Sequence, residues 1–284
     1  MIGFIGFGEA AFHIAKGLRG AGAPALLGYD IHHRTPARGE LIRSRASQAG
    51  AVLVDSPAEL AGRCDVLLSL VTADRAAEAA HQNRPHLHPR HLYADLNSVS
   101  PALKEAIGKE ISASAARYVE GAIMSPVPPK GHKVPIVVNG PFANDFIGAM
   151  GRYGMHLDAM NGEAGAAAAV KMCRSIVVKG MEAILLECLL ASTRYGVGER
   201  VFGSLDESFP GFQWRDQAWY MAGRVFEHGE RRAREMDEVA AMLRAAGIEP
   251  VMAEATARMQ DWRAGAGPAN SVEEMVALLS REKQ

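Results

Sequence analysis

A proline-free stretch rich in alanine and leucine, from Gly162 to Leu190, limits the fold of this chain more than any other feature. At a rise of ~1.5 Å per residue it predicts a helix of roughly 40 Å, which is long enough to cross a domain boundary. Most of its positions are apolar on every side, but its polar side chains fall within an arc of roughly 140°. These side chains are Lys171, Arg174, Ser175, Lys179 and Glu182. The stripe is either a solvated face or a functional surface, and the sequence before the helix is needed to choose.

The composition predicts a soluble protein of two domains. A chain of 284 residues is large enough for a substantial core, and its hydrophobic fraction of 48% and charged fraction of 22% are ordinary for globular proteins. The formal net charge of -1 gives no electrostatic reason to expect nucleic acid or a membrane as a partner. No apolar run reaches membrane-spanning length and no signal peptide precedes the first strand, so we expect a cytoplasmic protein. Cys64, Cys173 and Cys188 lack metal-ligand spacing and fit reduced core residues.

The chain begins with a strand-to-helix turn of the kind that binds dinucleotides. An apolar run from Met1 to Ile5 is followed by Gly6-Phe7-Gly8-Glu9-Ala10-Ala11, a G-x-G-x-x-A pattern that leads into a helical pattern. Gly6 permits the tight turn, Gly8 lets a pyrophosphate approach the backbone, and Ala11 is small enough for close packing. The amino end of the helix then offers N–H groups and a partial positive charge to the phosphates.

The end of the next strand bears on the choice between NAD and NADP. Residues 25–29 form an expected strand, and Asp30 follows it, 22 residues after Gly8. An acidic group there accepts hydrogen bonds from the adenosine ribose, which favours NAD. His33 and Arg34 follow, and they could instead hold the extra phosphate of NADP. The sequence leaves the cofactor open, with a slight preference for NAD.

The remaining apolar runs of the first half alternate with helical stretches, which predicts an α/β domain with a parallel sheet. Expected strands are 52–54, 65–71, 92–96, 117–126, 134–140 and 155–157, the last at a sheet edge. Ligands of such sheets bind beyond the carboxyl ends of the strands, so Val71, Thr72 and Asn97 are candidate cofactor contacts. We predict a Rossmann-like α/β dinucleotide-binding domain over residues 1–160 and an all-α domain for substrate binding and dimerisation over residues 161–284, joined by the long helix.

A histidine-rich segment, Pro85 to His91, raises the alternative of a metal site. The segment precedes a strand, which puts it at the end of the sheet opposite the cofactor, and no carboxylate or cysteine is interleaved. A polar surface loop accounts for it better, so we expect no metal.

Four motifs in this order resemble those of the β-hydroxyacid dehydrogenase superfamily, which contains 3-hydroxyisobutyrate dehydrogenase and 6-phosphogluconate dehydrogenase. The turn at 6–11 resembles its dinucleotide turn, and residues 95–101 resemble its D-x-S-T-x-x-P segment near the nicotinamide. Residues 120–126 loosely resemble the substrate loop D-A-P-V-S-G-G, and residues 165–171 the G-x-G-x-x-x-K catalytic motif. The resemblance covers about residues 1–190, and the carboxyl half is similar to a subgroup whose terminal domain is largely uncharacterised.

The resemblance implies an NAD(P)-dependent oxidoreductase. Hydride would pass between nicotinamide and the carbinol carbon of a small hydroxy acid or sugar acid, with Lys171 as general acid or base. Arg174 and Lys179 on the same stripe would help to lower the pKa of this lysine. Ser175, the second candidate catalytic residue, stands where the family usually has asparagine. Candidate substrate contacts are Ser98, Gly121, Ala122, Met124, Arg174, His228 and Arg232.

Beyond residue 190 the sequence predicts a helix end and turn at 191–203, a connection at 205–211, and helices at about 214–245, 252–263 and 271–281. His228, Arg231, Arg232 and Glu235 lie at helical spacing, and they either bind an acidic substrate or form a solvated or ion-paired face. Because this domain has many apolar faces, we expect a homodimer.

Two other functions are alternatives to the dehydrogenase hypothesis. An imine reductase shares the architecture but usually lacks the lysine, so Lys171 argues against it. A non-catalytic nucleotide-sensing protein is the other alternative, and the replacement of asparagine by Ser175 keeps it open.

Overall fold

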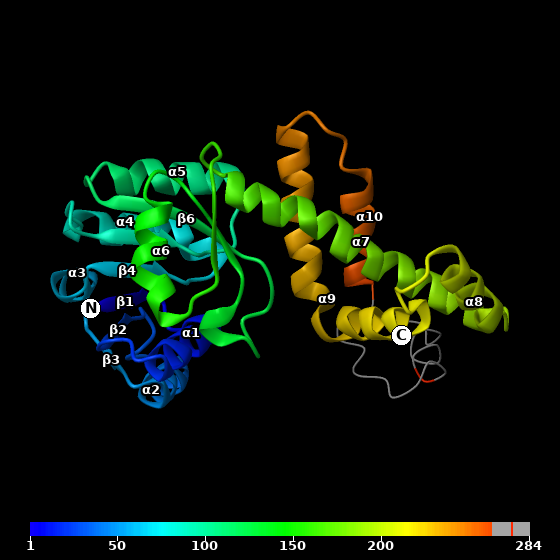
Figure 1. The fold of residues 1–284 in the computed structure, drawn as a ribbon, viewed down its shortest axis with the longest axis horizontal. Helices are drawn as coiled ribbons and strands as arrows, with labels where there is room; N and C mark the ends of the chain where they lie inside the picture. The colour runs from blue at the N-terminus through cyan, green and yellow to red at the C-terminus, as the bar shows by residue number, and fades with distance from the viewer. Residues whose placement is uncertain (263–273, 275–284) are drawn as a thin grey trace. The chain divides into compact units, whose positions relative to one another are not determined.

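The computed structural model describes residues 1–262 and residue 274 (Figure 1). The chain divides into two compact units, Met1–Lys171 and a second unit that begins at Met172. The predicted boundary after residue 160 lies in the loop before helix α7, Ala166–Arg194, whereas the two units meet inside that helix.

The first unit is built on one eight-stranded sheet in the order β3-β2-β1-β4-β5-β6-β7-β8. Strands β1 to β6 are parallel, β7 runs antiparallel to β6, and β8 is parallel to β7. The strands are β1 Ile2–Ile5, β2 Leu26–Tyr29, β3 Ala51–Leu53, β4 Val66–Ser69, β5 Leu92–Asp95, β6 Arg117–Ile123, β7 Ile136–Asn139 and β8 Leu157–Met160. Because β1 lies between β2 and β4, the strand order reverses at the carboxyl end of β1, which is where ligands of doubly wound sheets bind.

Helices cover both faces of this sheet. They are α1 Glu9–Gly20, α2 Pro36–Ala49, α3 Pro57–Arg63, α4 Ala76–Asn83, α5 Pro101–Ser112 and α6 Ala143–Met150, with short 3-10 turns at η1 Ala73–Arg75, η2 Arg84–His86, η3 Gly131–Lys133 and η4 Gly151–Tyr153. Helices α1, α2 and α6 contribute to one apolar cluster, and α3, α4 and α5 contribute to the other. Neighbouring strand residues alternate between the clusters, as Leu26 and Leu27 do, because successive side chains point to opposite faces. Buried faces on both sides explain why the strands are almost continuously apolar.

The described part of the second unit is helical. It contains most of α7, followed by α8 Gly198–Ser208, α9 Trp214–Ala245 and α10 Val251–Asp261. One apolar cluster joins α7, α8 and the first half of α9, and another joins α7, α10 and the second half of α9. An α/β unit followed by a helical unit confirms the predicted fold class.

Three helices differ from their prediction. The long helix begins at Ala166 instead of Gly162 because Gly165 has a φ of +91°, and it continues to Arg194. Helix α8 occupies residues predicted as a turn and a connection, so that prediction was wrong. Helix α2 was not predicted. Apart from residue 274, the helix expected at 271–281 lies outside the described residues. Among the described residues, no helix is both long and apolar enough to span a membrane.

Candidate active site

The glycine-rich turn has the geometry that a dinucleotide needs. Gly6 has a φ of +82°, and a Cβ atom there would lie 2.7 Å from the carbonyl oxygen of Leu70, so only glycine fits. Gly8 is different because it is extended and a Cβ atom on it would meet nothing within 4 Å. It is also the N-cap of α1, and no side chain caps that helix end. Open space beside an uncapped helix amino end fits a pyrophosphate group.

Other residues of the turn act through the backbone or through packing. The Phe7 side chain and Ala11 are fully buried in the core, whereas Glu9 is exposed and Ala10 is half-buried. The Phe7 N–H donates a hydrogen bond of 2.8 Å to Oδ2 of Asp30, so the turn is tied to the end of β2.

Asp30 and the loop after it form the predicted adenosine end of the site. The Asp30 carboxylate accepts a second hydrogen bond, of 2.8 Å, from the His32 N–H. His33 and Arg34 both reach Asp55, at 3.1 Å from His33 Nε2 to Oδ1 and 3.1 Å from Arg34 Nε to Oδ1. The hydrogen bond from Arg34, followed by that from His33, holds the pKa of Asp55 below its ordinary value. The two side chains predicted as an alternative phosphate site are therefore both hydrogen-bonded to Asp55.

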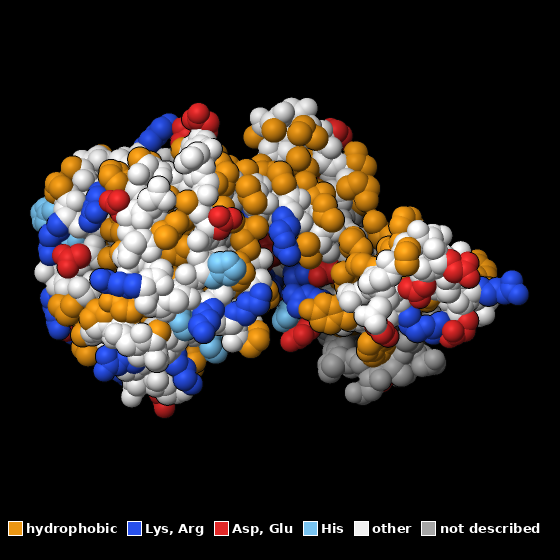
Figure 2. Space-filling view, viewed as in Figure 1, with side chains coloured by type: hydrophobic (Ala, Val, Ile, Leu, Met, Phe, Trp, Pro, Cys, Tyr) orange, Lys and Arg blue, Asp and Glu red, His pale blue; other side chains and the backbone are white. Residues whose placement is uncertain are grey.

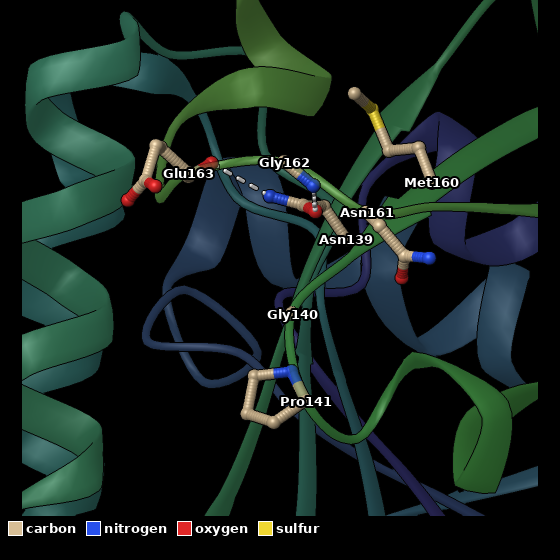
Figure 3. A pocket seen from close by; sticks show the side chains of 7 residues that line it. All are labelled: Asn139, Gly140, Pro141, Met160, Asn161, Gly162 and Glu163. Atoms are coloured by element: carbon tan, nitrogen blue, oxygen red, sulfur yellow. Dashed lines mark hydrogen bonds between the residues drawn. The ribbon is translucent and has the colours of Figure 1, made fainter.

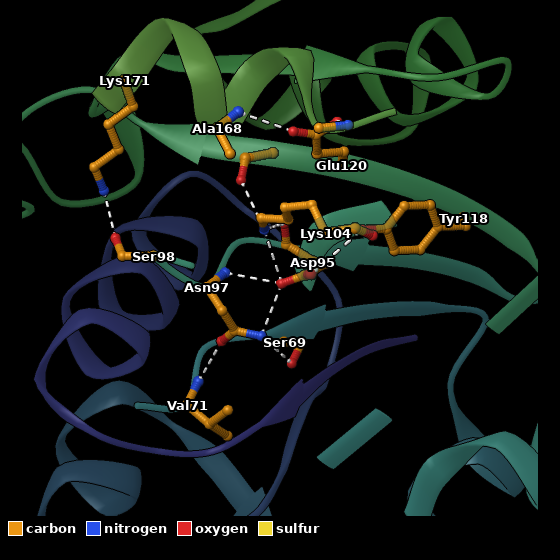
Figure 4. Close-up of polar contacts among 12 residues, drawn as sticks. Ser69, Val71, Asp95, Asn97, Ser98, Lys104, Tyr118, Glu120, Ala168 and Lys171 are labelled. Atoms are coloured by element: carbon orange, nitrogen blue, oxygen red, sulfur yellow. Dashed lines mark hydrogen bonds and ion pairs between the residues drawn. The ribbon is translucent and has the colours of Figure 1, made fainter. Parts of the chain in front are cut away.

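A buried polar network lies at the carboxyl ends of β4 and β5 (Figure 4). Asn97 is buried, accepts a hydrogen bond of 2.7 Å from the Val71 N–H, and donates to Ser69 and Asp95 at 2.9 and 2.8 Å. The hydrogen bonds of the Asn97 side chain therefore hold in place the loops that contain Val71 and Ser98. Thr72 follows Val71 and is exposed at the same edge.

Lys104 of α5 is buried at the centre of this network. Its amine lies 2.9 Å from Oδ1 of Asp95 and donates to the carbonyl oxygens of Asp95 and Gly121 at 2.6 and 3.2 Å. Burial lowers the pKa of this amine, while Asp95 favours its charged form. Tyr118 donates to the other Asp95 oxygen at 3.3 Å, and its burial raises the pKa of its hydroxyl. Asp95 and Lys104 were not among the predicted site residues.

Lys171, the predicted catalytic residue, donates a hydrogen bond to Oγ of Ser98 (Figure 4). Ser98 is exposed in the loop after β5, and Lys171 lies in the first two turns of α7. The first unit therefore brings together two predicted residues from different motifs, at the sheet edge that also carries the glycine-rich turn.

The predicted substrate loop begins beside them. Gly121 packs closely, because a Cβ atom there would lie 2.4 Å from Cδ2 of Leu96. Ala122 is buried, and Met124 is half-buried with its N–H bonded to the carbonyl oxygen of Pro135 at 2.9 Å. This loop can offer a ligand mainly backbone groups and the Met124 side chain.

The remaining candidates belong to the second unit. Ser175 is half-buried and Arg174 is exposed on α7, and His228 is half-buried on α9. Arg232 is buried, and its Nε donates a hydrogen bond of 2.9 Å to Glu182, so the ion-paired alternative describes this residue. Lys179 is also buried, with its amine 2.8 Å from Glu235. Two members of the polar stripe on α7, Lys179 and Glu182, are thus internal ion-pair partners of the second unit.

A separate hollow lies where β7 and β8 end (Figure 3). Asn139 bridges its wall by accepting from the Gly162 N–H at 3.0 Å and donating to the carbonyl oxygen of Glu163 at 2.9 Å. None of the predicted site residues lines it. Among the described residues, no group of three or more histidine, cysteine, aspartate or glutamate side chains could hold a metal ion.

Known proteins share both halves of this arrangement. Residues 1–124 match the family model described as the NAD binding domain of 6-phosphogluconate dehydrogenase, and residues 193–262 match a domain of unknown function, DUF1932. A conserved hypothetical protein from Sinorhizobium meliloti 1021 is 39% identical, with 98% of this chain and 95% of that chain covered and a TM-score of 0.82.

A second solved structure decides the family. It is described as a conserved protein of unknown function with structural similarity to 3-hydroxyacid dehydrogenases, and it is 32% identical over 92% of this chain and 96% of that chain, with a TM-score of 0.78. The chain belongs to the β-hydroxyacid dehydrogenase superfamily. L-Threonate dehydrogenase from Cupriavidus necator is a more distant relative, 28% identical over 69% of this chain and 66% of that protein. Membership confirms the predicted superfamily and its dehydrogenase class, and the first family model confirms a nicotinamide dinucleotide as the type of cofactor.

Proposed function

We propose that this protein oxidises or reduces a small hydroxy acid or sugar acid, with Lys171 as general acid and base. The observation that carries the proposal is the hydrogen bond from the Lys171 amine to Ser98 at the carboxyl edge of the sheet. A nicotinamide dinucleotide bound along the glycine-rich turn would supply the hydride acceptor or donor. The similarity to a dehydrogenase named for L-threonate, itself a hydroxy acid, supports the substrate class.

Each proposed site residue has its own role in the reaction. In the oxidative direction a neutral Lys171 takes the proton of the substrate hydroxyl, and in the reductive direction its ammonium returns it. Ser98 accepts the hydrogen bond from Lys171, which leaves its own hydroxyl hydrogen for the substrate. Ser175 and Arg174 follow on α7 and are the proposed second catalytic group and carboxylate partner.

We propose NAD as the preferred cofactor. Asp30 directly follows β2, where a carboxylate accepts hydrogen bonds from ribose hydroxyls and repels a phosphate. Arg34, the cation best suited to a phosphate, is held by Asp55. Both features favour the unphosphorylated ribose.

We also propose that the protein is a homodimer. Val177 and Ile184 are 63% and 56% exposed on α7, and they are seven residues apart and therefore on the same face of the helix. Tyr195, just after α7, is 81% exposed. Figure 2 shows hydrophobic side chains gathered over the region of α7 and its neighbouring helices. Large apolar side chains on one face of a long helix favour burial against a second copy.

The proposed activity is tested by recording absorbance at the reduced-nicotinamide band while hydroxy acids and sugar acids are screened with NAD and with NADP. Reduction with at least one acid, faster with NAD, is the expected result. If no acid supports reduction while either cofactor still binds, the dehydrogenase proposal is rejected and the nucleotide-sensing alternative takes its place.

A further inference from the structure

Glu120 of β6 is a buried carboxylate that joins the sheet to the start of α7 (Figure 4). Its Oε1 accepts a hydrogen bond of 2.8 Å from the Ala168 N–H, and its Oε2 accepts one of 2.9 Å from the Gly165 N–H. Asn139 donates a third hydrogen bond, of 3.2 Å, to Oε2. All three donors are N–H groups, so the carboxylate acts only as an acceptor.

These contacts fix the part of α7 that carries the catalytic amine. The first N–H groups of a helix have no partner within the helix, and a negative charge beside them is favourable. A buried carboxylate in turn needs such donors to offset its lost hydration. Lys171 follows Ala168 by about one turn, so its backbone position depends on the same anchor.

The next residue of β6 connects this anchor to Ser98. The Gly121 carbonyl oxygen accepts a hydrogen bond of 3.2 Å from Lys104, whose amine lies 2.9 Å from Asp95. Asp95 accepts hydrogen bonds from Asn97, the residue that precedes Ser98. One short segment of β6 therefore holds both sides of the contact between Lys171 and Ser98.

We propose that Glu120 is a positioning residue for the reaction, which holds the first turn of α7 so that the Lys171 amine meets Ser98 and the substrate hydroxyl. This inference rests on the proposed function. Glu120 has no contact with the reacting atoms and acts through the helix. A role in folding alone would change how much protein is folded, but it would leave the turnover of each folded site unchanged.

The test compares Glu120→Gln with Glu120→Asp and with the control Asp145→Asn. Glutamine keeps one acceptor oxygen and turns an N–H group toward another N–H donor, whereas aspartate keeps both acceptors on a shorter side chain. Asp145 is also a carboxylate in the first turn of a helix, α6, but it pairs with Arg117 at the start of β6, away from the site.

Turnover is expressed per cofactor-binding site, measured by titration with the reduced cofactor. For Glu120→Gln we expect kcat to fall by ~30-fold or more, because small displacements of a catalytic group are costly. Cofactor affinity should stay within about threefold, and Glu120→Asp should also lower kcat, because its carboxylate is one methylene too short to reach the same amides without displacing α7. Asp145→Asn should match the wild type. Equal kcat per site in Glu120→Gln and wild type would overturn the inference.

A second readout does not depend on turnover. In protein labelled with carbon-13 at the lysine ε position, the Lys171 NMR signal is identified by its loss in Lys171→Arg. This signal should move in Glu120→Gln and stay in place in Asp145→Asn, and an unmoved signal in both variants contradicts the positioning role. If the wild type turns over no acid, the proposed function fails, while the NMR signal still decides whether Glu120 controls Lys171.

Discussion

The amine of Lys171 donates a hydrogen bond to the hydroxyl oxygen of Ser98, a residue 73 positions earlier in the chain. Lys171 belongs to α7, and Ser98 to the loop after β5, so only the folded first unit brings them together. This contact, at the carboxyl edge of a doubly wound sheet, supports the proposal that Lys171 exchanges a proton with a bound alcohol.

Lys171→Ala should therefore reduce kcat on the true substrate by at least ~100-fold, the usual scale for the loss of a general acid and base. Cofactor affinity, measured by fluorescence titration with the reduced cofactor, should remain nearly unchanged. Lys171→Arg is the matched control because it keeps the positive charge but does not lose its proton at ordinary pH. Arginine should therefore fail to restore the oxidative reaction, and wild-type turnover in either variant would remove the catalytic assignment.

The strands and the long helix could be predicted because their signals are local. Apolar runs bounded by turns predicted strands β1 to β7, whereas the edge strand expected at 155–157 shares only Leu157 with β8, Leu157–Met160. The glycine-rich pattern predicted the sheet edge at which ligands of such folds bind. Helix α2 escaped prediction because it buries only Gly39, Ile42, Ala46 and Ala49, which form a weak apolar face between arginines. Helix α8 begins at a glycine and buries only Phe202.

The support of the site could not be predicted in the same way. Lys104 lies on the same face of α5 as the buried Ile107 and Ile111, but charged side chains are seldom buried and no sequence signal names Asp95 as its partner. Glu120 was visible only as part of a loosely matched motif, and its role depends on the amide groups of residues 45 and 48 positions later. Such contacts arise only when the strands and α7 pack together, so they can be identified only in the folded structure.

The pair of Lys104 and Asp95 should be essential for the stability of the first unit. Their side chains are 1% and 0% exposed, so Lys104→Met would leave an unpaired carboxylate in the core. Loss of one partner of a buried ion pair costs about 3–5 kcal/mol, so the free energy of unfolding in urea should fall by that amount. Lys109→Met is the control on the same helix, because Lys109 is 76% exposed and pairs with Glu105 on the surface. Lys109→Met should lower the free energy of unfolding by less than about 1 kcal/mol. Equal losses of stability in the two variants would contradict the conclusion that the buried pair of Lys104 and Asp95 stabilises the fold more than the surface pair does.

Asp55 should influence the choice of cofactor. It holds Arg34 and His33 beside the predicted ribose site, so Asp55→Ala would release both side chains toward a phosphate. We expect the ratio of kcat/KM with NADP to kcat/KM with NAD to rise by roughly 3- to 10-fold, since an arginine–phosphate contact is charge-assisted. Arg34→Ala in the same background should reverse the gain. If the ratio of kcat/KM with NADP to kcat/KM with NAD is unchanged in Asp55→Ala, then Arg34 does not contact the extra phosphate of bound NADP.

The three cysteines should differ in reactivity toward a thiol reagent such as Ellman's reagent. Burial raises the pKa of Cys64 to about 11, so at pH 8 only about one thiol in a thousand carries the reactive negative charge. The thiolate fraction grows as the pH rises toward that value, and burial adds a steric barrier. Cys173, which was expected in the core, is exposed instead, so it should react first, a phase that Cys173→Ser removes. Rapid reaction of Cys64 in the folded protein at pH 8 would show that its pocket opens to solvent.

The exposed face of α7 should determine the oligomeric state. Val177 and Ile184 point to one side of the helix, and burial of such side chains is worth about 1.5–3 kcal/mol each. A glutamate at each position would bring two charges into a dimer interface, so Val177→Glu combined with Ile184→Glu should convert a dimer to a monomer in light scattering after gel filtration. Val52→Glu is the control, because Val52 is 56% exposed on β3 of the first unit, and it should leave the mass unchanged. A wild type that is monomeric at all concentrations, or a dimer that survives the double substitution, would show that this face of α7 has another use.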